Sequence, residues 1–469
     1  MNDLNQLTIL EAKKGLREKN FSSLELTKAC LDRIKAVESK INAFVTVCEN
    51  EALEDAKKAD EQMAKGEEKP LLGIPISIKD NFNTKGARTT ASSKVLDDYI
   101  PPYDATVVAR LKEAGMVLLG KTNLDAWAHG SSTETSDYGT TKNPWNTLHL
   151  PGGSSGGAAA SIAADEAIAA IGSETAGSIR QPSDWCGVVG LKPTYGRISR
   201  YGVVAMASSL DSPGPITKSV QDAALILQVL AGQDRFDGTT SPKIPEDYLK
   251  NLEKSIQGLK IGISDEYFEG VTEPVREKVQ EALKVIEKLG GNLIKIKLFP
   301  PEHSIAVYTI LQRAEVSSNL ARYDGIRFGK DRSFFADEAK RRIMLGTYAL
   351  SAGYYDQYYN KAQKVRTVII NDFNSAFDKV DVIIVPTNPW TALKLGASKD
   401  NPMYGEMADA LVEPSSIAGL PGINVPCGFS KEGLPIGFQV IGPQFSESLI
   451  LNVANIYEQS RERKERPKL

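Results

Sequence analysis

Short apolar strands alternate with helical segments over most of this chain, and this alternation restricts its possible folds more than any other feature. The helical spacing of apolar residues in 5–66 gives way to a period of two in 72–79. Further strands are expected at 116–119, 167–171, 259–264, 292–297, 382–386 and 436–441, with helices at 105–114, 158–164 and 273–289. The alternation predicts an α/β fold with a mixed, mostly parallel central β-sheet that α-helices cover on both faces.

The length of the chain is compatible with one large domain. Its 469 residues, 41% of them hydrophobic, are enough to bury a single extended core. We expect residues 1–469 to form that domain, with a helical N-terminal segment at 1–66 and the catalytic motifs within 67–220. The polar stretch 234–247 is the best candidate for an internal boundary.

Charge and cysteine usage exclude several classes of protein. Lys and Arg total 56 against 59 Asp and Glu, so a net charge of -3 gives no electrostatic reason for direct nucleic-acid binding. The four scattered cysteines lack a C-x-x-C pair, which indicates a reducing compartment without a structural metal. No signal peptide and no apolar stretch long enough to span a membrane is found. We therefore expect a cytoplasmic protein that binds no metal and no membrane.

Two motifs match known patterns without the structural context that those patterns need. Residues 115–122 fit the Walker A pattern, but the four residues between its glycines belong to an expected strand. Residues 152–156 fit G-x-S-x-G, yet the residues before them are poor strand formers. The chain has only three histidines, His129, His149 and His303. A Ser-His-Asp triad therefore stays open only as the less favoured alternative, and hydrolysis near neutral pH needs another general base.

Lys79 is the strongest candidate for that base. It ends the apolar strand 72–79 and is followed by Asp80 and Asn81. In one interpretation its side chain extends from the strand end into solvent. In the other, burial among isoleucines lowers the pKa of Lys79, so that its neutral amine accepts a proton.

Two loops of small residues supply hydroxyl and backbone N–H groups. The run 152–157 reads G-G-S-S-G-G and carries Ser154 and Ser155, although flexible linkers have a similar composition. The run 172–182 follows an expected strand and carries Ser178. A strand that ends in a tight turn of small residues presents consecutive N–H groups to one point, as an oxyanion hole requires. An ordinary strand-to-helix turn is the alternative.

Together these segments closely resemble the amidase signature family, in which a strand-borne lysine accompanies a G-G-S-S-G-G loop. Ser178 follows Ser154 by 24 residues, as in the family, and the runs 186–196, 214–216 and 418–422 extend the likeness over nearly the whole chain. The resemblance implies the amidase signature fold, with Ser178 as nucleophile, Ser154 as bridging serine and Lys79 as base.

The same resemblance implies an oxyanion hole made of backbone N–H groups. Those groups belong to Thr175, Ala176, Gly177 and Ser178, and Ser155 supports the network through hydrogen bonds. Amide hydrolysis by this arrangement needs no metal or organic cofactor.

Within the family, the runs 120–123, 130–134, 191–199, 317–325 and 340–343 are most similar to the A subunits of glutamyl-tRNA(Gln)/aspartyl-tRNA(Asn) amidotransferases. Such a subunit releases ammonia from glutamine for a B subunit, which uses ATP and Mg to amidate mischarged tRNA, and a C subunit clamps around it. The likeness implies that Arg342 binds the α-carboxylate of glutamine and Asp409 its α-ammonium. Tyr308 is a third substrate-binding candidate. A solvated helix charge and a loop carboxylate are the alternatives for Arg342 and Asp409.

Three departures bear on the substrate. The nucleophile loop reads T-A-G-S where T-G-G-S is usual, and the methyl of Ala176 restricts the backbone if this residue needs a positive φ, besides narrowing the pocket. The segment 308–313 is bulkier and more polar than usual. Glu413 stands where an apolar residue normally precedes the proline. We favour a position of Glu413 in solvent, and selection of a cationic substrate is the alternative.

Three functions are compatible with these features. The favoured one is the A subunit of a tRNA amidotransferase. A free-standing amidase acting on small aliphatic or aryl amides is the second, and a catalytically idle scaffold is the third. The complete set of Lys79, Ser154 and Ser178 argues against the idle scaffold. The sequence leaves open the substrate, the need for partner subunits and the oligomeric state.

Overall fold

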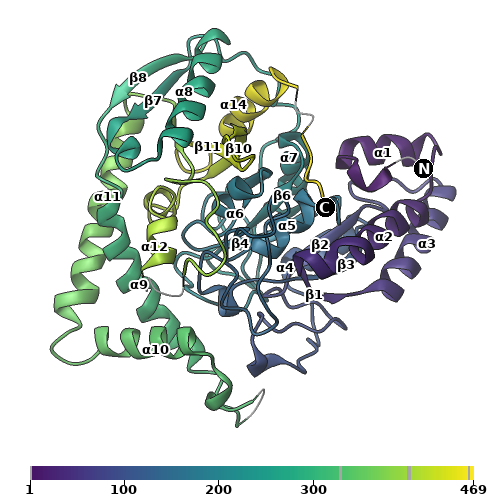
Figure 1. Cartoon of the computed structure of the whole chain (residues 1–469), viewed down its shortest axis with the longest axis horizontal. Coiled ribbons are helices and arrows are strands. Elements are labelled where there is room, and N and C mark those ends of the chain that lie inside the picture. The colour runs from purple at the N-terminus through teal and green to yellow at the C-terminus, as the bar shows by residue number, and fades with distance from the viewer. Residues whose placement is uncertain (1–2, 327–329, 399–402, 463–464) are drawn as a thin grey trace.

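An eleven-stranded β-sheet runs through the centre of the molecule (Figure 1). The computed structural model describes residues 3–326, 330–398, 403–462 and 465–469. The strand order is β1-β3-β2-β4-β6-β5-β10-β11-β9-β7-β8. The strands are β1 (Phe44–Val47), β2 (Pro75–Lys79), β3 (Val117–Thr122), β4 (Ala169–Glu174), β5 (Val189–Lys192), β6 (Ser212–Thr217), β7 (Lys260–Ser264), β8 (Asn292–Ile296), β9 (Val382–Pro386), β10 (Gly422–Phe429) and β11 (Pro435–Ile441).

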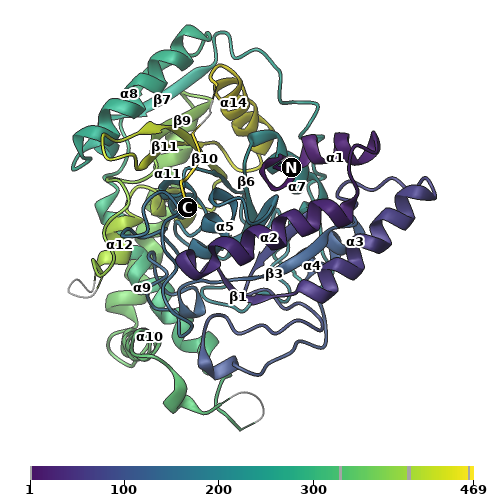
Figure 2. The same ribbon diagram turned by 45° about the vertical axis from the view of Figure 1, so that its right-hand side comes forward.

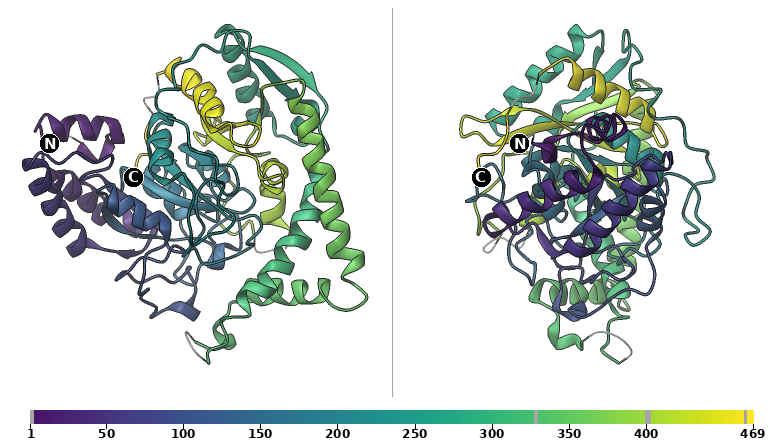
Figure 3. Two further views of the ribbon diagram at one scale, coloured as in Figure 1. Left: turned by 180° about the vertical axis from the view of Figure 1, so that it is seen from behind. Right: turned by 90° about the vertical axis from the view of Figure 1, so that its right-hand side faces the viewer.

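Helices flank this sheet and extend beyond both of its ends. In Figures 1 and 3 the N-terminal helices lie at one end of the molecule, and the long helices α9 and α11 run side by side at the other. The helices are α1 (Ile9–Arg17), α2 (Ser23–Ile41), α3 (Glu49–Ala64), α4 (Thr106–Glu113), α5 (Gly156–Ala163), α6 (Arg180–Trp185), α7 (Val220–Leu230), α8 (Glu273–Lys288), α9 (Glu302–Leu320), α10 (Asp337–Ala349), α11 (Lys361–Phe377), α12 (Tyr404–Ala408), α13 (Glu413–Ile417) and α14 (Glu447–Gln459).

Local sequence explains where several of these helices begin. Capping boxes start α1 at Thr8 with Glu11 and α2 at Ser22 with Glu25, so the first free N–H groups of each helix are bonded. Helix α5 is buried on every side, which its small residues allow, and it packs against the central strands in the view of Figure 2.

The predicted single domain with a mixed sheet and helical cover is confirmed. The apolar side chains of one main core reach from α1 to α14, which leaves no second core of comparable size among the described residues. Whether the connection 234–247 separates two folding units stays a prediction. None of the helices in the described ranges has the length and apolar character that crossing a bilayer requires.

The expectation of a mostly parallel sheet is wrong. Parallel pairing joins β2 to β3 and β4, and β7 to β8 and β9, whereas the other six neighbouring pairs among the described strands are antiparallel. A parallel pair needs a crossover connection, usually a helix, and neither β5–β6 nor β10–β11 has a helix between its strands. Counting helices along the sequence does not reveal which strands become neighbours.

The expected helical segment 1–66 also contains one strand. Strand β1 lies between α2 and α3 and pairs antiparallel with β3 at the edge of the sheet. Its four residues, FVTV, are β-branched or aromatic, but so short a run is easily hidden between two helices.

Strands β2 and β4 place the motifs that carry chemistry. They are parallel neighbours, so Lys79 at the end of β2 and the turn after β4 lie at the same edge of the sheet. The loop 152–155 leads into α5, which packs on both strands. Three segments that are far apart in the sequence therefore meet at one point.

Candidate active site

Lys79 is fully buried at the end of β2. Its Nζ lies 2.8 Å from Oγ of Ser154, 2.9 Å from Oγ of Ser155 and 3.1 Å from the carbonyl oxygen of Ser173. Burial lowers the pKa of Lys79 to about 7, although three nearby carboxylates act in the opposite direction. The interpretation of Lys79 as a lysine that extends into solvent is therefore wrong.

The loop 152–157 is a packed element of this site and not a linker. The N–H of Ser155 donates to the carbonyl oxygen of Ser178 at 3.1 Å, which joins the loop to the following turn. The peptide bond between Gly153 and Ser154 is cis. A side chain at Gly153 would overlap with the carboxylate of Asp125, so glycine is needed there to let the loop pack so closely.

The turn after β4 is held closed by a buried ion pair. Nη2 of Arg180 lies 2.6 Å from Oε1 of Glu174, and the N–H groups of Ile179 and Arg180 both donate to Oε2 of Glu174 at 3.0 Å. Among the residues that the structure describes, none accepts a hydrogen bond from the N–H groups of residues 175–178. These four N–H groups are the ones expected in the oxyanion hole, and they are free to bind an acceptor.

Sequence reasoning missed the role of Glu174 and Arg180. Arg180 also donates to Ser415, Ser416 and Gln439, so it connects the turn to α13 and β11. A buried ion pair across a turn leaves no periodic pattern in the sequence. The only sign in the sequence is a charged residue at each end of the small-residue run 174–180.

Ala176 fits the turn without backbone strain. It is not among the described residues that have a positive φ, so its methyl group is accommodated. Gly177 is the position that excludes a side chain, because a Cβ there would overlap with Val412 and Asp409.

Ser178 lines a small hollow together with residues from distant parts of the chain. The other lining residues are Gly130, Ser131, Tyr308, Arg342, Gly405, Glu406 and Asp409. All three predicted substrate-binding residues are therefore brought to the expected nucleophile. Ser131 and Glu406 were missed. Ser131 belongs to the run 130–134, which is similar to the A subunits, but the sequence assigned no role to this residue.

Charged groups in this hollow are buried and mostly paired. Nε of Arg342 donates to Oε1 of Glu338 at 2.5 Å, and its Nη2 lies 3.8 Å from Oε1 of Glu406. Burial opposes the charge of Arg342, but the two carboxylates raise its pKa, so it stays a cation. Ser131 Oγ donates to Oδ2 of Asp409 at 2.5 Å. The interpretation of Arg342 as a solvated helix charge is therefore wrong. Asp409 does lie at a helix end, as the C-cap of α12, but its side chain is buried in the hollow.

The expectation that Glu413 faces solvent is also wrong. Its side chain is fully buried at the start of α13, a helix that packs against α9 and α11. Burial raises the pKa of Glu413 well above the usual range, and the neighbouring carboxylates Asp409 and Glu406 act in the same direction.

The Walker A match at 115–122 and the Ser-His-Asp alternative lack structural support. Residues 117–122 form strand β3, so the Walker A match lacks its loop. Among the described residues no histidine is hydrogen-bonded to Ser154 or Ser178, whereas Lys79 contacts Ser154 directly. No group of three or more His, Cys, Asp or Glu in the described ranges is arranged to hold a metal ion.

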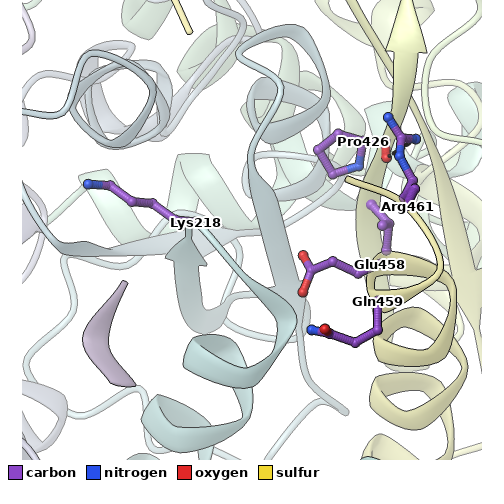
Figure 4. A pocket seen from close by; sticks show the side chains of 6 residues that line it. Lys218, Pro426, Glu458, Gln459 and Arg461 are labelled. Atoms are coloured by element: carbon purple, nitrogen blue, oxygen red, sulfur yellow. Dashed lines mark hydrogen bonds between the residues drawn. The ribbon is translucent and has the colours of Figure 1, made fainter. Parts of the chain in front are cut away.

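A second hollow lies away from this site, between β10, the end of α14 and the start of α7. Figure 4 shows its lining residues Lys218, Pro426, Glu458, Gln459 and Arg461, with the amino group of Lys218 directed away from the others. Lys218 pairs with Asp165 at 2.9 Å. No serine, threonine or cysteine is among the residues that line this hollow, whereas Ser178 lines the first one.

Comparison with known proteins agrees with this geometry. A family model described as Amidase matches residues 25–451. The chain belongs to the amidase family. It is therefore an enzyme that acts on amide carbon–nitrogen bonds, and the resemblance inferred from its motifs is confirmed.

Within this amidase family, the chain is similar to the A subunits of tRNA amidotransferases. It is 52% identical to the A subunit of the glutamyl-tRNA(Gln) amidotransferase of Thermoanaerobacter pseudethanolicus, over 99% of this chain and 98% of that protein. The solved A subunit of the Thermotoga maritima enzyme superimposes with a TM-score of 0.83 at 42% identity, over 97% of this chain and 94% of that one. A solved amidase superimposes with a TM-score of 0.85 at 29% identity, over 97% and 99%.

Proposed function

We propose that this amidase releases ammonia from glutamine as the A subunit of a tRNA-dependent amidotransferase. The observation that carries the proposal is the placement of Arg342 and Asp409 in the same hollow as Ser178. A buried cation and a carboxyl group beside a nucleophile suit an α-amino acid that carries a side-chain amide. The 52% identity to the A subunit of a glutamyl-tRNA(Gln) amidotransferase supports the same substrate.

The proposed chemistry starts with a proton relay through Ser154. With a pKa of about 7, part of the Lys79 population is neutral and accepts the hydroxyl proton of Ser154 across the 2.8 Å contact. Ser154 in turn accepts the proton of Ser178, whose oxygen attacks the amide carbon. Ser155 holds the amine of Lys79 in place at 2.9 Å.

The free N–H groups of residues 175–178 would stabilise the oxyanion that forms in this attack. Removing one such donor typically costs roughly 3 kcal/mol of barrier. As the tetrahedral intermediate collapses, the relay returns a proton to the leaving nitrogen and ammonia departs. Water then loses a proton to the same relay, attacks the acyl group on Ser178 and releases glutamate, without any cofactor.

Partner subunits would use the ammonia. By likeness to the A subunits, we propose B-type and C-type partners, of which the B-type subunit uses ATP and Mg to amidate tRNA. This chain itself is proposed to contact neither the nucleic acid nor a membrane.

One observation favours a second candidate, a free-standing amidase of small or aryl amides. Arg313 is buried and its Nη2 pairs with Oε1 of Glu406 at 2.6 Å, within the bulky segment 308–313. Arg313 and Arg342 thus both pair with Glu406, Arg313 at 2.6 Å and Arg342 at 3.8 Å. A hollow so filled is also compatible with a smaller amide substrate.

Ammonia release by the full chain separates the two candidates. The substrates are glutamine, asparagine and simple and aryl amides, tested with and without B-type and C-type subunits, and Ser178→Ala serves as the blank. Glutamine hydrolysis that rises when the partners and charged tRNA are added supports the amidotransferase function. Brisk hydrolysis of simple amides with glutamine ignored would establish the free-standing amidase instead.

A further inference from the structure

Three helices bring two arginines to one carboxylate at the hollow. Helix α9 packs against α10 and α12 (Figure 1), and these three helices carry Arg313, Arg342 and Glu406, respectively. Oε1 of Glu406 lies 2.6 Å from Nη2 of Arg313 but 3.8 Å from Nη2 of Arg342. Glu406 and Arg342 line the hollow beside Ser178, whereas Arg313 is not among its lining residues. Arg313 therefore holds Glu406 from outside the hollow.

The contact with Arg313 is the stronger of the two. Its guanidinium donates a hydrogen bond to Glu406, and both side chains are buried. The 3.8 Å separation from Arg342 is too long for a hydrogen bond. Burial acts to raise the pKa of Glu406, but the two arginines outweigh it and lower that pKa, so Glu406 stays an anion. A buried anion needs a bonded partner, and Arg313 supplies it.

Arg342 thereby keeps part of its guanidinium available. Its Nε donates to Glu338 at 2.5 Å, and Glu338 also accepts from Arg341. Among the residues that the structure describes, none accepts a hydrogen bond from Nη1 or Nη2 of Arg342. A guanidinium with free N–H groups binds a carboxylate in a fork geometry, so Arg342 can still take one more carboxylate.

Removal of Arg313 would change the charge around Arg342. Arg342 would then be the only cation among the described residues within ion-pair distance of Glu406. In a buried site an anion 3.8 Å from a cation is drawn towards it, because little water screens the attraction. Arg342 would lie between Glu338 and Glu406, and this pair of carboxylates would repel a third one from a substrate.

We propose that Arg313 is a positioning residue that determines specificity: it keeps Glu406 bonded to itself, so that Arg342 accepts a carboxylate of the substrate. This inference rests on the proposed function and deepens it, because the selected substrates are amides that also carry a carboxylate. Arg313 acts through Glu406 and Arg342 and not through contact with the substrate. It belongs to the segment 308–313, which is bulkier and more polar than is usual in A subunits.

The test compares glutamine with γ-aminobutyramide, which is glutamine without its α-carboxylate. Affinities are measured by ligand-observed NMR titration with the full-length Ser178→Ala protein, so that turnover does not interfere. Arg313→Gln should weaken glutamine binding by about 10-fold and change γ-aminobutyramide binding by less than about 3-fold. Arg313→Lys retains the charge and should stay within about 3-fold of the parent for both compounds.

A second substitution separates the charge of Arg313 from its packing. The double variant Arg313→Gln/Glu406→Gln removes both charges of the pair and should return glutamine binding to within about 3-fold of the parent. Arg197 provides the matched control, since it is a buried arginine that pairs with Glu447 at 3.6 Å, and neither residue lines the hollow. Arg197→Gln should leave both affinities unchanged.

The inference would be overturned by any of four results. These are equal weakening of both compounds by Arg313→Gln, the same effects from Arg197→Gln, a double variant that binds glutamine as weakly as Arg313→Gln does, and a parent protein without preference for glutamine over γ-aminobutyramide. If Arg313→Gln does not fold, Glu406→Gln alone provides the test. It removes the competing carboxylate and should tighten glutamine binding by at least about 3-fold, and unchanged binding would contradict the inference.

The proposed function is tested separately by ammonia release from glutamine in the protein that retains Ser178. Selective binding of glutamine without turnover, even with the partner subunits, would reject that function and leave the role of Arg313 standing. Turnover of glutamine, with a ratio of the two affinities that Arg313→Gln does not change, would do the reverse.

Discussion

The amino group of Lys79 lies 2.8 Å from the hydroxyl oxygen of Ser154, and neither side chain is exposed to solvent. Burial brings the pKa of the amine to about 7, so this contact is able to move a proton near neutral pH. In the proposed relay, a chain with only three histidines thereby obtains its general base from lysine.

The pH profile of hydrolysis follows from this pKa. Below about pH 7 the amine is protonated and accepts nothing, so kcat/KM should rise through about 7 and then level off. Initial rates with an amide that does not titrate, from about pH 5.5 to about pH 9, measure the profile. A rate that falls over this range would contradict the role of Lys79.

Two buried lysines allow a matched comparison. Lys192 also has a pKa of about 7 through burial, but its Nζ donates to the carbonyl oxygens of Pro193 and Leu420 and not to a serine. We expect Lys79→Met to reduce kcat by at least about 1,000-fold. Lys192→Met should stay within about 10-fold of the parent per folded molecule, because it leaves the relay intact. Similar losses of kcat per folded molecule in both variants would contradict a special role of Lys79 as the general base.

Removal of the nucleophile should abolish turnover without unfolding the chain. Ser178→Ala is expected to lower kcat by about 10,000-fold or more, with an unchanged circular dichroism spectrum. The control is Ser161→Ala, since Ser161 is a buried serine that donates to Ala158 within α5 at 2.8 Å. If Ser178→Ala retains activity, another residue attacks the amide.

The ion pair that closes the nucleophile turn should contribute to both stability and rate. Arg180→Met leaves Glu174 as an unpaired buried charge, and we expect the free energy of unfolding to fall by about 3–5 kcal/mol. Urea denaturation of Arg180→Met, Glu174→Gln and the double variant gives the coupling between them. If the double variant loses as much free energy of unfolding as the two single variants together, the two residues are not coupled.

Treatment with a chelator should not change glutamine hydrolysis, because the proposed relay uses only side chains and backbone N–H groups. The assembled complex provides the control, since its ATP-dependent amidation should stop under the same treatment. Loss of hydrolysis that a divalent cation restores would reveal a metal in the ammonia-releasing step.

Much of the site could be anticipated because its signals are local. The period-two run ending at Lys79, the glycines around Ser154 and the small residues around Ser178 each belong to one continuous segment. These segments could be predicted from the sequence because the local spacing of residue types indicates a strand, a close-packed loop and a tight turn.

Other features depend on contacts between distant segments and have no local signal. The antiparallel centre of the sheet follows from which strands become neighbours, and β1 is stabilised by pairing with β3. Arg180 of the pair Glu174–Arg180 donates to Ser415 in α13, and Glu413 is buried at the start of α13, which packs against α9.

The sequence by itself determined that this protein is an amidase with Lys79, Ser154 and Ser178 in matching segments, because residue type and spacing along one segment carry that information. Only the tertiary structure decided what surrounds Ser178, the proposed nucleophile. Tyr308, Arg342 and Asp409 come from three separate helical regions and reach Ser178 through packing. Glu413 is buried at the start of α13, which packs against α9 and α11, and a one-dimensional pattern does not specify that packing.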